Sequence, residues 1–130
     1  MSLLERQTLE QRYAIAVHTK VEAYSKNEDK TKKDNYGGMA FTLPIMIRSA
    51  GLVQALHFAS TRKKQGQKDF LRDLAAVLGE QDLLRASREA SITEYMQLTR
   101  KTLAVLVWFK RFAQSILDLD ASDVTNQTDE

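Results

Sequence analysis

The chain has 130 residues, a length that suits one domain with its own hydrophobic core. It contains no cysteine, which excludes disulfides, thiolate catalysis and cysteine-ligated zinc, and no apolar run approaches the roughly 18 residues of a membrane span. The net charge is only +2, but five of the 17 acidic residues lie among the last 13, so the remaining body carries a charge of +7.

Apolar residues recur at steps of three and four along most of the chain, and this period predicts α-helices. The first predicted helix covers 3–24, with an apolar stripe from Leu9 to Tyr24. Its charged start lacks a signal-peptide core, so we expect a cytoplasmic protein. Residues 25–35 contain no apolar side chain, and burial cannot offset the entropy of ordering them, which predicts a mobile loop.

A second helical segment covers 36–50, and either Asp34 or Asn35 is a candidate cap for its start. Pro44 either begins a new helix in its first turn or kinks a continuous one. We favour a short helical turn followed by a helix from Leu43. Gly51 then marks a break or a close packing point.

The middle of the chain predicts three shorter helices. They cover 52–63, 69–78 and 82–88, with a polar turn at 64–67 and a stop at Gly79.

The last helix begins at Ser91 and Glu94, which form the S-x-x-E pattern of a capping box, and its apolar stripe continues to Ile116. Leu103 and Val107 lie on the opposite side from Phe109, so this helix is apolar on two sides. It is therefore either central in the fold or part of an interface. Trp108, on the flank, either packs in the core or contacts a partner.

These elements predict an all-α, single-domain bundle of five to six helices, framed by long N-terminal and C-terminal helices. The predicted domain covers 1–117, and the acidic segment 118–130 is predicted to be a disordered tail.

The sequence contains no recognisable catalytic or metal-binding motif, so we expect a protein that is not an enzyme and needs no cofactor or metal. His18 and His57 are far apart in sequence and lack zinc-ligand spacing. A site that joins them with carboxylates in three dimensions stays open as a small-hydrolase alternative.

The basic body predicts contact with the phosphates of a nucleic acid, without base readout. The candidate side chains lie on the first helix, around the polar turn at 64–67, and on the last helix. They are Lys20, Lys63, Lys64, Lys68, Arg100, Lys101, Lys110 and Arg111. The candidates for contact with another subunit are Leu103, Val107 and Trp108.

Several stretches resemble the small subunit of the type III-B CRISPR effector, the Cmr complex. They are Tyr36-Gly37, LPIMI at 43–47, GLVQALHF at 51–58, and a closing helix with Glu94-Tyr95, Leu98-Thr99 and WFKRFA at 108–113. Their order and spacing, together with the first helix, cover nearly the whole chain before the tail. Ala50 departs from the family's pattern, and the first loop is longer and richer in lysine.

The resemblance implies a non-catalytic, all-α subunit of an antiviral ribonucleoprotein. Several copies of such a subunit stack as a filament beside the repeated backbone subunit and near the large subunit. They line the channel of the guide RNA–target RNA duplex and touch chiefly the target strand. The alternative is a helical adaptor that binds protein without contacting RNA.

Overall fold

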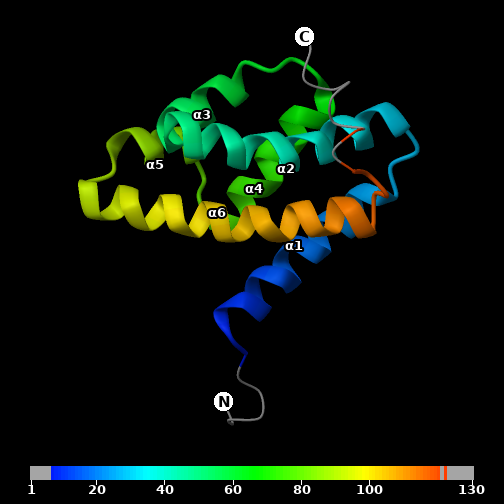
Figure 1. Cartoon of the computed structure of the whole chain (residues 1–130), viewed down its shortest axis with the longest axis horizontal. Coiled ribbons are helices and arrows are strands. Elements are labelled where there is room, and N and C mark those ends of the chain that lie inside the picture. Colours follow the sequence, from blue (N-terminus) through cyan, green and yellow to red (C-terminus); the bar gives the residue numbers. More distant parts are fainter. Residues whose placement is uncertain (1–6, 121, 123–130) are drawn as a thin grey trace.

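The computed structural model describes residues 7–120 and 122, and these residues form six α-helices and no β-strand (Figure 1). This confirms the all-α class and the predicted number of helices. The helices are α1 (Leu9–Ser25), α2 (Lys30–Ala50), α3 (Leu52–Ser60), α4 (Gln65–Leu78), α5 (Leu83–Glu89) and α6 (Ile92–Ser115).

The capping box predicted for the last helix is confirmed. The Ser91 hydroxyl accepts from the Glu94 N–H at 3.2 Å, and the Glu94 carboxylate accepts from the Ser91 N–H at 3.0 Å. One stripe of α6 enters the core through Val105, Leu106 and Phe109. The capping box at its start and an apolar stripe that continues to its end explain why this helix was predicted within one residue.

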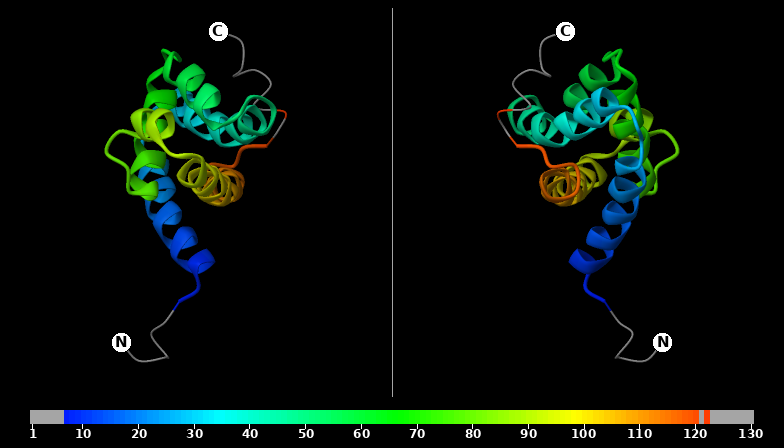
Figure 2. Two further views of the ribbon diagram at one scale, coloured as in Figure 1. Left: turned by 90° about the vertical axis from the view of Figure 1, so that its left-hand side faces the viewer. Right: turned by 90° about the vertical axis from the view of Figure 1, so that its right-hand side faces the viewer.

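The first helix starts later than predicted, because Thr8 and Gln11 form a second capping box at its start. Of the predicted extra residues, 3–6 lie outside the described part of the chain, and residues 7 and 8 precede the helix. Only the C-terminal half of the stripe is buried, from Val17 onward, whereas Leu9 is 55% exposed. The N-terminal half of α1 projects from the bundle (Figure 2).

The predicted mobile loop at 25–35 is largely wrong, because α2 already begins at Lys30. The Asp29 carboxylate accepts from the Lys32 N–H at 3.2 Å, so Asp29 is the cap, in place of Asp34 or Asn35. Lys30 and Asp34 pair at 3.0 Å one turn apart, and Asn35 is buried.

Pro44 lies inside α2, so the predicted short turn and new helix at Leu43 are wrong, and the chain takes the continuous alternative. An internal proline costs a helix about 3 kcal/mol. Leu43, Pro44 and Ile47 are all buried, and their packing offsets that cost. The predicted break at Gly51 is confirmed, with φ at 90°.

The turn between α3 and α4 lies earlier than predicted, at 61–64 in place of 64–67, and the helix predicted to run to residue 63 is three residues shorter. α3 ends at Ser60 and α4 begins at Gln65, so most of the expected polar turn at 64–67 is helical. Gly66 and Gln67 are buried there because the first turn of α4 packs against α2. Gly79 ends α4 in the left-handed conformation, as predicted, and Asp82 caps α5.

The core lies around α2, which packs against α3, α4 and α6 (Figure 1). α1 and α6, the predicted frame, pack against each other. Tyr36, Phe70 and Phe109 meet edge to face, with ring centroids 4.9 to 6.5 Å apart. Leu119 also packs into the core, beyond the predicted domain boundary at 117; the tail prediction falls mainly on residues outside the described part.

Candidate interaction surfaces

The described residues contain no cluster of three or more side chains that could hold a metal ion, and none of their helices is long and apolar enough to cross a bilayer. The two histidines have different neighbours. His18 meets Phe112 edge to face at 5.2 Å, and the His57 Nε2 atom lies 3.4 Å from Arg88 Nη1. His18 also lies 3.9 Å from the Glu22 carboxylate, and none of these contacts joins the two histidines.

A groove of about 320 Å³ runs between α2 and α6 and combines apolar and cationic side chains. Ile45 is 65% exposed and Val107 is 41% exposed. The described residues that line the groove include no acidic side chain. They are Phe41, Pro44, Ile45, Arg48, Leu103, Leu106, Val107, Lys110, Arg111 and Gln114.

The groove joins candidates from both predicted classes. Leu103 and Val107 lie beside Lys110 and Arg111, because residues three and four apart share a helix face. Lys110 Nζ lies 5.8 Å from the centre of the Phe41 ring. Prediction from sequence found only the α6 wall, because nothing local indicates which helix lies opposite.

Trp108 points elsewhere, toward α1. Its indole N–H donates to Glu10 Oε1 at 3.3 Å, and its ring stacks on Phe112 at 5.7 Å. The ring is half-buried, and Arg111 lies 6.0 Å from its centre. Trp108 therefore packs within the chain and keeps an exposed edge.

The other basic candidates lie apart from the groove. Lys63, Lys64 and Lys68 gather at the α3–α4 turn, and the chain from Asn35 to Lys68 has no acidic residue. Lys20 is half-buried on α1, and Arg100 is exposed on α6. Lys101 donates from Nζ to the carbonyl oxygen of Leu78 at 3.1 Å, so it helps to cap the C-terminal end of α4.

A second hollow, of about 360 Å³, lies where α5 meets the start of α6. Glu80, Glu89 and Glu94 line it, and Ile92, the first residue of α6, is 81% exposed. Arg85 pairs with Glu89 at 3.1 Å, which reduces the negative charge at one side of the hollow. This corner was not predicted from the sequence, because its glutamates alternate with arginines along the chain.

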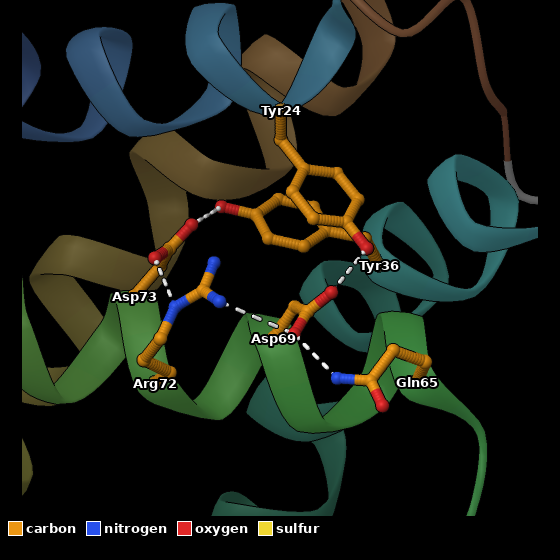
Figure 3. Close-up of polar contacts among 6 residues, drawn as sticks. All are labelled: Tyr24, Tyr36, Gln65, Asp69, Arg72 and Asp73. Carbon is orange, nitrogen blue, oxygen red and sulfur yellow. Dashed lines mark hydrogen bonds and ion pairs between the residues drawn. The ribbon is translucent and has the colours of Figure 1, made fainter. Parts of the chain in front are cut away.

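Two tyrosine–aspartate pairs hold the α3–α4 turn in place (Figure 3). The Tyr24 hydroxyl donates to Asp69 and the Tyr36 hydroxyl to Asp73, both at 2.7 Å, and the two rings stack with centroids 3.9 Å apart. Arg72 donates to both carboxylates, at 3.1 and 3.2 Å. This network ties α4 to α1 and α2, and so positions the lysines of the turn.

The network changes the pKa values of both tyrosines and of Asp69. Burial and the hydrogen bond to Asp73 raise the pKa of Tyr36, and burial and Asp69 do the same to the pKa of Tyr24. Partial burial opposes ionisation of Asp69, but hydrogen bonds from Tyr24 and Gln65 and the charge of Arg72 outweigh it and lower the pKa of that carboxyl. The Asp69 carboxylate therefore stays ionised and both tyrosines stay neutral over the physiological range.

The fold and its surfaces define a small helical-bundle protein with a surface groove between α2 and α6, and its described residues form no cluster that could hold a metal ion. Comparison with known proteins identifies the family. A family model for CRISPR-associated proteins, Cas_Cmr5, matches residues 9–116. The chain therefore belongs to the Cmr5 family, which confirms the resemblance seen in the sequence.

Two relatives support this assignment. The CRISPR system Cmr subunit Cmr5 of Thermus thermophilus is 42% identical over 114 residues, which cover 85% of this chain and 97% of that protein. The X-ray structure of a CRISPR-associated Cmr5 family protein from Thermus thermophilus matches with a TM-score of 0.78 and 42% identity, over 86% of this chain and 99% of that one. The family-model match ends at 116, so the acidic segment 118–130 lies beyond it.

Proposed function

We propose that this protein is a non-catalytic small subunit of a type III-B Cmr ribonucleoprotein that acts in the cytoplasm in antiviral defence. Family membership carries this proposal, since the relative from Thermus thermophilus is named as a Cmr subunit. In this role the chain stacks in several copies beside the backbone and large subunits, and holds target RNA against the guide.

RNA contact is supported by the charge of the α3–α4 turn. Lys63, Lys64 and Lys68 lie in a stretch of 34 residues without an acidic side chain, so this part of the chain carries only positive formal charge. Lysines at the α3–α4 turn can bind RNA phosphates through charge, without contacts to the bases. Arg100, Lys110 and Arg111 are a separate set of exposed cations on α6. Lys20 and Lys101 are half-buried, and the Lys101 Nζ atom already donates to the Leu78 carbonyl, so Lys101 is a weaker candidate.

Reversal of three charges tests the RNA contact. We expect the K63E/K64E/K68E variant, assembled into the complex, to bind target RNA more weakly than the unaltered complex. The logarithmic salt dependence should become shallower by about 2. Filter binding across a salt series measures both quantities.

A matched control reverses Arg12, Lys26 and Lys33, which lie on α1, the α1–α2 loop and the first turn of α2. This control should leave the affinity and the salt slope unchanged. If the test variant also leaves both unchanged, the protein-only adaptor is the better description.

Stacking is supported by complementary surfaces on one molecule. The groove between α2 and α6 presents Arg48, Lys110 and Arg111 around exposed Ile45 and Val107. The α5–α6 corner presents three glutamates, and exposed Ile92 begins α6 at the same corner. Two different complementary patches form a heterologous contact, which continues from copy to copy as a filament when the rotation between copies does not close a ring.

A mixing experiment tests this head-to-tail arrangement. Val107→Asp blocks the groove and Ile92→Asp blocks the corner, and both side chains are exposed, so the fold should be retained. Each variant alone should stay monomeric at concentrations where the unaltered chain forms longer species. Their mixture should stop at pairs, because only one groove and one corner remain compatible. Sedimentation velocity distinguishes these outcomes, and mixtures longer than pairs would contradict the arrangement.

A further inference from the structure

Phe58 is an exposed aromatic side chain on a rigid helix. It lies on α3 but outside the buried face formed by Leu52, Leu56 and Ala59, and it is 53% exposed. The apolar pattern placed Phe58 beside the core, and the structure turns it outward. Only the part of its apolar surface that is removed from water stabilises the fold, so the outer part of the ring is available to a ligand.

The positively charged guanidinium group of Arg62 lies over the Phe58 ring. The guanidinium carbon of Arg62, one turn further along the chain, is 5.1 Å from the centre of the Phe58 ring. The Thr61 hydroxyl donates to the Phe58 carbonyl at 2.6 Å, and the Ser60 hydroxyl donates to the His57 carbonyl at the same distance. These bonds fix the last turn of α3, and so the place from which both flat groups project.

The surroundings of the pair are cationic. Lys63 is exposed directly after Arg62, and Arg88 reaches from α5 to His57, the residue next to Phe58. A flat apolar ring beside several cations fits a ligand that is both aromatic and anionic.

We propose that Phe58 and Arg62 form a stacking site for an unpaired base of single-stranded RNA. Bases stack on phenyl rings and on guanidinium planes, and Lys63 and Arg88 then face the phosphates on either side. A base inside a duplex has both faces covered, so this site takes nucleotides outside the guide–target duplex. The inference rests on the proposed RNA role and specifies the part of the RNA that this surface binds.

The test compares RNA with and without bases, using the isolated full-length chain. The probe is a short single strand that carries 2-aminopurine, and its counterpart is an abasic strand of equal length and charge. We expect Phe58→Ala to weaken binding of the base-containing strand by at least about fivefold and to leave binding of the abasic strand unchanged. Phe58→Trp should retain binding, because it keeps a flat aromatic face.

Ile92→Ala is the matched control, because it removes another exposed apolar side chain from a different corner. This control should have no effect on either strand. Equal losses on both strands with Phe58→Ala, or no loss on either, would overturn the stacking site. So would failure of the unaltered chain to bind the base-containing strand, or a Phe58→Ala defect confined to assembly with other subunits.

The outcome is separable from that of the proposed function. If the assembled complex keeps its Lys63-, Lys64- and Lys68-dependent salt slope while Phe58→Ala has no effect, only the stacking site is refuted. If reversal of those lysines has no effect on the complex, the RNA role itself fails.

Discussion

The tyrosine–aspartate pairs connect residues that are far apart in the sequence. Tyr24 and Asp69 are separated by 45 positions, and Tyr36 and Asp73 by 37. Tyr36 is 1% exposed and Asp73 is 5% exposed, so neither group has water as an alternative partner. A buried polar group without a partner is costly, and this makes each pair specific for one packing of α4.

Tyr36→Phe tests the buried pair. It removes the hydroxyl and leaves Asp73 Oδ2 without its hydrogen bond, while the ring packing stays. We expect a loss of about 1 to 3 kcal/mol in the free energy of unfolding, measured by urea denaturation. Tyr13→Phe is the same substitution at a half-buried tyrosine for which the described residues provide no hydrogen bond, and it should change stability by less than about 0.5 kcal/mol. Equal effects would refute the role of the hydroxyl.

Asp69 makes stability depend on acid pH. Its pKa is lower in the folded chain than the ordinary value of 3.8, so the folded state binds this proton less tightly than the unfolded state. The stabilisation is therefore complete above the ordinary pKa and is lost as the pH falls through the lower folded value. The stability difference between the unaltered chain and Asp69→Asn should shrink between about pH 5 and about pH 2. A pH-independent difference in urea denaturation would contradict this account.

At the level of the helices, the close approach of α4 to α2 depends on a glycine. A Cβ on Gly66 would overlap the backbone carbonyl oxygen of Lys32 and lie 2.9 Å from the Cβ of Asn35. Backbone atoms cannot move aside as the end of a flexible side chain can. The first turn of α2, which local composition describes as a loop, is therefore part of a helix–helix contact.

Gly66→Ala separates packing from helix propensity. Alanine favours a helix by up to about 1 kcal/mol over glycine, but the overlap should cost more, so we expect a net loss of about 1 to 3 kcal/mol. Lys68→Ala, an exposed change on the same helix, should alter stability by less than about 0.5 kcal/mol. Thermal denaturation followed by circular dichroism measures both variants, and a higher melting temperature for Gly66→Ala would rule out the close contact.

At the scale of the whole bundle, the chain folds back after α6 and packs against α2 near Gly37. Leu119 is 6% exposed, and one of its methyl groups occupies the space that a side chain at Gly37 would fill. The Leu119 N–H also donates to the Ala113 carbonyl at 3.1 Å. The packed domain therefore extends to Leu119.

Leu119→Ala tests this closure. Because the side chain is buried between α2 and the end of α6, we expect a loss of about 2 kcal/mol or more in urea denaturation. Leu9→Ala makes the same change at a residue that is 55% exposed and should have little effect. Similar losses for the two variants would mean that Leu119 adds no more to stability than an exposed leucine.

Features that depend on neighbouring residues could be predicted from the amino-acid sequence alone. A capping box and an apolar stripe lie within a few turns of one another, so α6 was predicted closely, and Gly51 and Gly79 were identified as helix ends on the same basis. The family resemblance also lies in local motifs whose order along the chain can be followed directly.

Features that depend on distant residues became visible only in the folded chain. Helix formation at 30–35 and at 65–68 gains its stability from packing between α2 and α4, which no local pattern encodes. The same holds for Pro44 inside α2, for the tyrosine–aspartate network, and for the α2 wall of the groove. Burial and hydrogen bonding between elements outweigh local preferences of about 1 kcal/mol per residue, and these interactions exist only once the helices have packed together.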